Sequence, residues 1–157
     1  MRPTPWAPVP ELALTVEIDA PQQQVWDAVV DWPTQGAWML LTRVEGTAQQ
    51  GRGVGGGIAA FTGIGRVGFL DTMTITTWEP PHRCLVVHTG KVVRGTGAFE
   101  VEALSETRSR FRWSEQVDLP LGILGRIGWV FTKPLVAAGV RYSLRRLARQ
   151  LAARPPA

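Results

Sequence analysis

The chain has few of the residue types that build disulfides, metal centres and nucleophile pairs. Its 157 residues include one cysteine, Cys84, and two histidines, His82 and His88. One cysteine excludes a disulfide within the chain, and the dispersed histidines lack the spacing of a zinc site. Cys84 lies in an apolar stretch, which is typical of a small core residue rather than a reactive thiol. We therefore expect no metal and no other cofactor.

Acidic residues are missing from the last quarter of the chain. None follows Asp118, whereas basic residues continue as far as Arg154. A cationic helix can attract nucleic acid or anionic lipid, but a run of like charges is more often a solvated helix face. No nucleic-acid-binding motif accompanies it, so we expect no specific nucleic acid as a partner. Peripheral contact with an anionic membrane through the basic C-terminal helix remains an open hypothesis.

Long uninterrupted apolar runs are also missing. The stretch from Leu121 to Val130 is interrupted by Gly and Arg, and it is shorter than the roughly 20 residues of a membrane-spanning helix. The first residues do not contain the apolar core of a signal peptide. A cytoplasmic location is expected.

Alternating polarity marks the first element. Apolar residues recur at every second position from Leu12 to Ile18, as in a half-buried strand. Pro21 then suits the first turn of a helix that continues to Asp31. Pro33 is expected to begin a second short helix carrying Trp38 and Met39 before the next strand starts near Leu41. We expect a single domain over residues 11–153, after an irregular lead-in (1–10) and before a tail (154–157).

Turn signals set the register of the later strands. Glu79 to His82 and Ser105 to Thr107 each separate two strands, and Gly90-Lys91 fits a two-residue hairpin. The resulting register brings two opposite-charge pairs together, Glu102 with Arg110 and Glu100 with Arg112. It also places one set of side chains on the concave, buried face, including Phe69, Asp71, Met73, Cys84, Val86, His88, Phe99, Phe111, Trp113 and Glu115.

A long helix near residues 122–152 is expected to cover that face. Val130, Phe131, Leu147 and Leu151 belong to an apolar series at broadly helical spacing, which we assign to the side facing the sheet. Pro134 is expected to kink or divide the helix.

Several segments together resemble the START and birch-pollen-allergen superfamily (SRPBCC), in particular its polyketide cyclase/dehydrase-like branch. They are Ala20-Pro21 to Trp26, Asp31 to Trp38, Trp78 to Pro81, Gly95 to Phe99, and Phe111-Arg112-Trp113. The resemblance implies an α+β helix-grip fold, with a seven-stranded antiparallel sheet wrapped around the C-terminal helix and two short helices between strands 1 and 2. It also implies a cavity for lipids, sterols, polyketides or other apolar molecules. Some members of the family catalyse cyclisation, dehydration or hydrolysis, and many only bind.

Two inward glycines, Gly95 and Gly97, allow two interpretations. They leave volume unfilled beside Phe99 and Trp113, which suits an apolar ligand. Alternatively, they allow the strand to bend around the helix. Both interpretations remain open.

Candidate catalytic residues are Glu115, Asp71 and His88. Glu115 interrupts an apolar inward series opposite Gly97. It is expected to orient a polar ligand group or to act as a desolvated acid or base, and the alternatives are that it pairs with an arginine or lies at a wet rim. Asp71 and His88 share the inner face, and a carboxylate that fixes the tautomer of an imidazole is a common arrangement for proton transfer. An inward histidine is, however, more often a hydrogen-bonded core residue. The expected cavity lining consists of Trp38, Met39, Phe69, Met73, Phe99, Phe111, Trp113, Glu115, Val130 and Phe131.

Three functions follow from these features. The leading hypothesis is binding or transport of an apolar small molecule in an internal cavity. The second is a cyclase or dehydratase that uses cavity acid and base residues without metal or nucleotide cofactor. The third is a regulatory partner-binding protein, and we expect a monomer or a homodimer.

Overall fold

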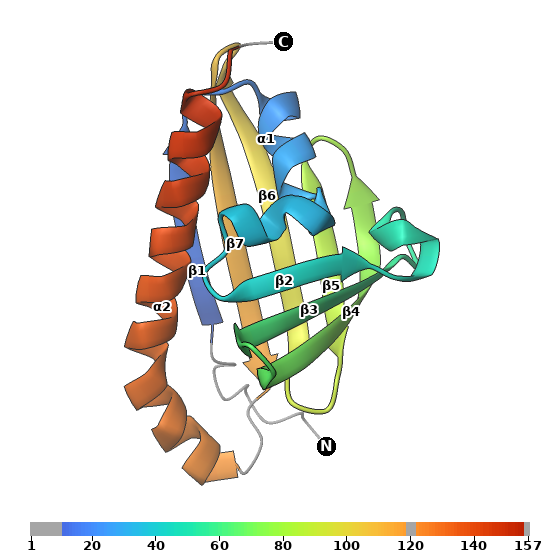
Figure 1. Cartoon of the computed structure of the whole chain (residues 1–157), viewed down its shortest axis with the longest axis vertical. Helices are drawn as coiled ribbons and strands as arrows, with labels where there is room; N and C mark the ends of the chain where they lie inside the picture. The colour runs from blue at the N-terminus through green and yellow to red at the C-terminus, as the bar shows by residue number, and fades with distance from the viewer. Residues whose placement is uncertain (1–10, 119–121, 156–157) are drawn as a thin grey trace, which may run out of the picture.

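Seven antiparallel strands form one curled sheet in the order β1-β7-β6-β5-β4-β3-β2. The computed structural model describes residues 11–118 and 122–155, and Figure 1 shows the long helix α2 running beside β1. The expected lead-in (1–10) and the last two residues of the expected tail lie outside the described residues. The expected helix-grip α+β fold is confirmed.

The elements follow one another with short connections. Two short helices lie between β1 and β2, as expected, and a further 3-10 turn lies within the glycine-rich connection from β2 to β3. In chain order the elements are β1 (Glu11–Ile18), α1 (Gln22–Val29), η1 (Trp32–Ala37), β2 (Thr42–Gly46), η2 (Ala48–Gly51), β3 (Gly57–Ile64), β4 (Val67–Glu79), β5 (Arg83–Thr89), β6 (Arg94–Ser105), β7 (Arg108–Asp118) and α2 (Gly122–Ala152).

The short helices close one end of the concave face. Helix α1 buries Val25, Trp26 and Val29, and the ring of Trp26 meets the edge of Trp78 on β4 with 5.2 Å between centroids. The second helix, η1, is a 3-10 helix, and Trp38 follows its last residue instead of lying within it. Proline in its first turn is compatible with this tight geometry. Burial of these aromatic rings anchors the core at this end.

The register expected from turn length is confirmed for β6 and β7. Glu102 lies opposite Arg110 and Glu100 lies opposite Arg112, and the ion pairs measure 3.1 Å and 4.0 Å. The β5–β6 turn is longer than expected, because four residues, from Gly90 to Val93, separate the strands. A difference of two residues preserves which side chains face inward, since the side-chain period of a strand is two.

Gly95 allows β7 to approach β6 closely. Its φ is +119°, and a Cβ at this position would collide with the backbone carbonyl oxygen of Gln116 on β7. Only glycine adopts this backbone conformation without strain. The close approach therefore requires a glycine here, and the bending interpretation stays a prediction.

Helix α2 runs without interruption from Gly122 to Ala152, with Pro134 inside it. It is therefore not divided at the proline. Its buried side chains all lie in the second half, where it packs chiefly against β1. They are Ser143, Leu144, Leu147 and Leu151.

The expected orientation of the first half of α2 is wrong. Val130 and Phe131 were assigned to the sheet-facing side, but they are 68% and 74% exposed. The buried residues of the second half fix the rotation of the helix about its axis, and at 100° per residue this rotation points Phe131 away from the sheet and Val130 to the flank of the helix. The first half carries apolar residues on every side, so its own periodicity does not determine which side is buried.

Candidate functional site

A cavity of about 470 Å³ lies between the concave face of the sheet, η1 and α2. Its inner wall consists of buried residues such as Trp32, Ile58 and Val86, whereas Leu41 and Phe69, at the other side, are exposed. The cavity therefore opens to solvent near the start of β2 and the β3–β4 hairpin. A volume of this size suits a small organic molecule.

Most of the expected lining residues border this cavity. Met39, Phe69, Met73, Phe99, Trp113 and Glu115 do so. Trp38 and Phe111 are buried in the adjoining hydrophobic core and are not part of the cavity wall. Val130 and Phe131 are exposed and are not part of the cavity wall, so their assignment to the lining is also corrected.

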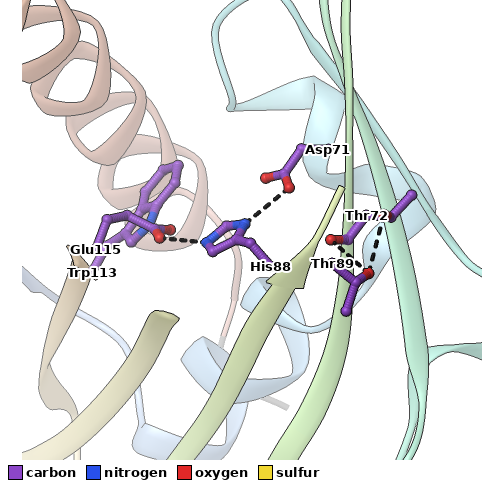
Figure 2. Close-up of polar contacts among 6 residues, drawn as sticks. All are labelled: Asp71, Thr72, His88, Thr89, Trp113 and Glu115. Atoms are coloured by element: carbon purple, nitrogen blue, oxygen red, sulfur yellow. Dashed lines mark hydrogen bonds and ion pairs between the residues drawn. The ribbon is translucent and has the colours of Figure 1, made fainter. Parts of the chain in front are cut away.

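The three candidate catalytic residues form one hydrogen-bonded network. His88 on β5 lies between two carboxylates: its Nδ1 is 2.9 Å from Oδ1 of Asp71 on β4, and its Nε2 is 2.8 Å from Oε2 of Glu115 on β7. Figure 2 shows the ring bridging the two acids, with Thr72 and Thr89 bonded to each other apart from this network. The sequence had suggested Glu115 and the Asp71–His88 pair as separate candidates, and the fold joins them.

The ring of His88 is positively charged at neutral pH. Burial by itself lowers the pKa of this histidine, but the hydrogen bonds and negative charges of Asp71 and Glu115 outweigh that effect and raise the pKa to about 9. Both ring nitrogens face carboxylate oxygens, and only the protonated ring has an N–H for each. One positive ring between two carboxylates leaves one negative charge in excess at the cavity wall.

Trp113 and Gly97 hold Glu115 in place. The indole Nε1 of Trp113 donates to Oε1 of Glu115 at 2.7 Å. Gly97 lies directly opposite Glu115 in the sheet, and a Cβ on Gly97 would come within 2.8 Å of Oε2. The space left by this glycine is therefore occupied by the carboxylate. Gly97 thus makes room for the carboxylate of Glu115, a role that differs from the two considered from the sequence, a void for ligand and a bend in the strand.

All three residues of the network border the cavity, and the two acids are its more exposed members. The side chains of Asp71 and Glu115 are 14% and 18% exposed, whereas that of His88 is 3% exposed. A ligand would therefore meet chiefly carboxylate oxygens, which His88 positions. Cys84 also borders the cavity, and burial raises the pKa of its thiol to about 12, so it is a neutral, unreactive thiol at pH 7.

The network is not arranged as a metal site. Both nitrogens of His88 are engaged with the acids, so no nitrogen lone pair is directed to a point shared with them. Within residues 11–118 and 122–155, no group of histidine, cysteine and acidic side chains has an arrangement that could hold a metal ion.

Several lining residues were not predicted from the sequence. Trp32 and Gln35 come from η1, where a 3-10 turn gives no clear periodicity. Trp129 and Val136 come from the first half of α2, whose orientation the apolar pattern does not determine. The indole N–H of Trp129 is buried and has no hydrogen-bond partner among the described residues.

Comparison with protein families gives one match that covers most of the chain. The model of a family described as "Polyketide cyclase / dehydrase and lipid transport" matches residues 10–152. Curated protein sequences give no match.

Solved structures share the fold at low sequence identity. A protein from Thermus thermophilus is 17% identical with a TM-score of 0.72, covering 92% of this chain and 98% of that one. A START superfamily protein from Mycobacterium smegmatis is 15% identical with a TM-score of 0.64, covering 92% and 95%. The di-domain ARO/CYC protein BexL from the BE-7585A biosynthetic pathway is 17% identical with a TM-score of 0.68, covering 92% of this chain and 50% of BexL. This chain thus spans half the length of BexL.

Proposed function

Because the chain belongs to the polyketide cyclase/dehydrase and lipid transport family, we propose that it binds an apolar small molecule in the cavity, with a polar end of the ligand at Asp71 and Glu115. The observation that carries this proposal is that the cavity wall is mostly apolar but contains one cluster of charged side chains. Apolar and aromatic side chains make up most of it, and the charged groups gather in a single network. A mostly apolar pocket with a few convergent polar groups is typical of small-molecule sites.

The excess negative charge of the network limits the ligand class. No lysine or arginine is among the described residues that line the cavity, so an anionic ligand finds no counter-charge there. The carboxylate oxygens of Asp71 and Glu115 accept hydrogen bonds. We expect the ligand to be neutral with a hydroxyl or similar donor, or cationic, and we expect carboxylates and phosphates to be disfavoured.

A matched set of probes tests this ligand class. A fatty alcohol, a fatty amine and a fatty acid of the same chain length differ only at the polar end. At neutral pH we expect the alcohol or the amine to bind about tenfold or more tightly than the acid, measured by calorimetry or displacement of a fluorescent probe. Preferential binding of the acid would contradict the charge argument, and binding of no apolar probe at all would contradict the proposed function.

A second candidate function, acid–base catalysis, is favoured by one observation. Glu115 faces the cavity while held on both oxygens, by Trp113 and by His88, and a fixed carboxylate beside a bound substrate is the geometry that proton transfer requires. In a cyclase or dehydratase of this kind, Glu115 would exchange the proton, and His88 would act as a positioning residue. Mass spectrometry of ligand retained after native purification would identify the compound to assay.

Substitution of Glu115 by Gln separates the two candidates. The Glu115→Gln change keeps side-chain size and most hydrogen-bonding capacity but removes the titrating proton. A carrier should retain its ligand within about tenfold in affinity, equivalent to about 1.4 kcal/mol. An enzyme should keep binding and lose roughly 10² to 10⁴ in turnover. If neither property changes for any ligand that the protein holds, Glu115 is structural.

A further inference from the structure

The first half of α2 exposes an apolar face that no other described part of the chain covers. Ile123 is 76% exposed and Phe131 is 74% exposed, and Ile127, between them, is also exposed. Residues four positions apart lie on the same side of a helix, so these three form one stripe. Single exposed apolar residues are ordinary, but a contiguous group of this kind marks an interaction surface.

The opposite side of the same helix lines the cavity. Trp129, Val136 and Val140 face inward at spacings of seven and four residues. The helix therefore separates the cavity from the exposed stripe. A partner that covers the stripe would lie directly beside the cavity opening.

The β3–β4 hairpin adds apolar surface near the same opening. Ile64 and Val67, at its turn, are 72% and 81% exposed, and Phe69 borders the cavity together with Val136 of α2. In Figure 1 the hairpin and the start of α2 lie toward the same end of the molecule, away from its C-terminus. We call this region the mouth surface, and define it by Ile64, Val67, Ile123, Leu124, Ile127 and Phe131.

The charged residues of the β3–β4 turn and of the first half of α2 are all of one sign. Arg66 lies in the hairpin turn. Arg126 and Lys133 lie three residues before and four residues after Trp129, so they share with it the side of α2 that faces the cavity. None of the three takes part in an ion pair within residues 11–118 and 122–155, and neither α2 nor the turn contains an acidic residue. A second copy docked symmetrically on this surface would bring like charges together. An apolar stripe on one side of α2, together with cations at the cavity side and in the hairpin turn, instead matches the surface of an anionic bilayer.

The helix has the length and composition of a membrane-crossing segment, but the fold argues against crossing. Leu144, Leu147 and Leu151 of its second half belong to the hydrophobic core, so a span would have to detach from the domain. The exposed apolar stretch from Ile123 to Leu135 is about 18 Å long at the rise of an α-helix. A segment of this length can lie along the interface of one leaflet, with its apolar residues in the acyl region and its cations at the headgroups.

We propose that the mouth surface docks on an anionic lipid bilayer, with the first half of α2 and the β3–β4 turn entering one leaflet and Arg66, Arg126 and Lys133 at headgroup depth. The long stems of these cations allow their charged ends to reach the headgroups while their bases lie deeper. This placement differs from contact through the basic second half of α2, which the sequence had suggested. It orients the cavity opening toward the lipid.

Co-sedimentation of the full-length protein with vesicles tests the proposal. Vesicles of phosphatidylcholine alone are compared with vesicles of equal parts phosphatidylcholine and phosphatidylglycerol. We expect binding to the anionic vesicles that weakens with salt. The double variant Ile127→Ser/Phe131→Ser should bind about tenfold or more weakly. The matched control Leu104→Ser, an exposed apolar residue at the end of β6, should bind as the unchanged protein does.

Charge variants and the oligomeric state complete the test. Arg126→Gln/Lys133→Gln should weaken binding to anionic vesicles, whereas Arg145→Gln/Arg149→Gln on the second half should have little effect. The reverse pattern would overturn the placement on the mouth surface, and absence of binding to either vesicle would overturn the proposal.

A concentration-dependent dimer in sedimentation velocity, abolished by Ile127→Ser/Phe131→Ser, would show that a second copy covers this surface instead. All variants change exposed residues, so unchanged circular dichroism should confirm that they fold.

Discussion

Glu115 accepts hydrogen bonds on both carboxylate oxygens, from the indole of Trp113 and from the ring of His88. Each donor fixes a different oxygen, so the carboxylate plane is held without an arginine. The sequence-based alternatives for Glu115 were a pair with arginine or a place at a wet rim. The structure gives it a partner of another kind, a buried imidazolium shared with Asp71.

The charge on His88 should make stability depend on pH. Its pKa is about 9 in the folded protein and 6.5 for the ordinary group, so the folded state binds the proton more tightly. The stabilisation is complete below pH 6.5 and is lost as the pH rises through about 9. We expect the free energy of unfolding to fall by up to about 3 kcal/mol over this interval, measured by urea denaturation at a series of pH values.

A pair of histidine variants provides the control for this dependence. His88→Gln should remove most of the slope between pH 6.5 and pH 9. His82→Gln, which changes an exposed ring that is hydrogen-bonded to Gln22, should retain it. An unchanged slope in His88→Gln would show that other groups cause the pH dependence.

At the scale of elements, strand register was predictable and helix orientation was not. The turns at Glu79 and Ser105 have few compatible geometries, and alternation in β6 and β7 then decides which face each residue occupies. This placed Glu115 opposite Gly97 from the sequence alone. In α2, by contrast, Ile123 and Phe131 point to one side and Trp129 points to another, and all three are apolar, so the apolar pattern of the first half does not show which side faces solvent. The cavity residues of α2 were missed for the same reason.

The close approach of β6 and β7 depends on Gly95, and substitution there should be costly. Gly95→Ala forces a Cβ against the backbone of β7 at a positive φ, and we expect a loss of about 1 to 3 kcal/mol or more in the free energy of unfolding. Gly65→Ala is the matched control, because Gly65 also has a positive φ, +61°, but its Cβ would meet no atom within 4 Å. Its cost should be limited to about 1 to 2 kcal/mol. Equal costs for the two variants would argue that the clash with β7 contributes little to the cost at Gly95.

The whole molecule has a closed end and an open end. At the closed end α1, η1 and the second half of α2 pack onto the sheet, and Trp26, Leu147 and Leu151 are buried there. At the open end the cavity wall includes exposed residues such as Leu41 and Phe69. The stable core and the ligand cavity thus lie at different ends of the same sheet. A change in the cavity should therefore affect binding more than folding.

Filling the cavity tests this separation. Val86 borders the cavity opposite Gly97, and Val86→Phe should remove space that a ligand would occupy. We expect the fatty alcohol probe to bind about tenfold or more weakly, while the free energy of unfolding falls by less than about 1 kcal/mol, because the ring enters a void and not a packed core. Val87→Phe places the same ring on the outer face of β5 and should leave binding unchanged. Strong destabilisation by Val86→Phe alone would indicate that the cavity collapses in solution.

The network around His88 also has a consequence for how the sheet assembles. Asp71, His88, Gly97 and Glu115 come from four consecutive strands, β4 to β7, so no single hairpin contains the complete set. A slip of one residue in any of these pairings would turn one member to the outer face. The imidazolium would then be buried with a partner missing, which costs about 3 to 5 kcal/mol. The network should therefore favour the native register of these strands over registers shifted by one residue.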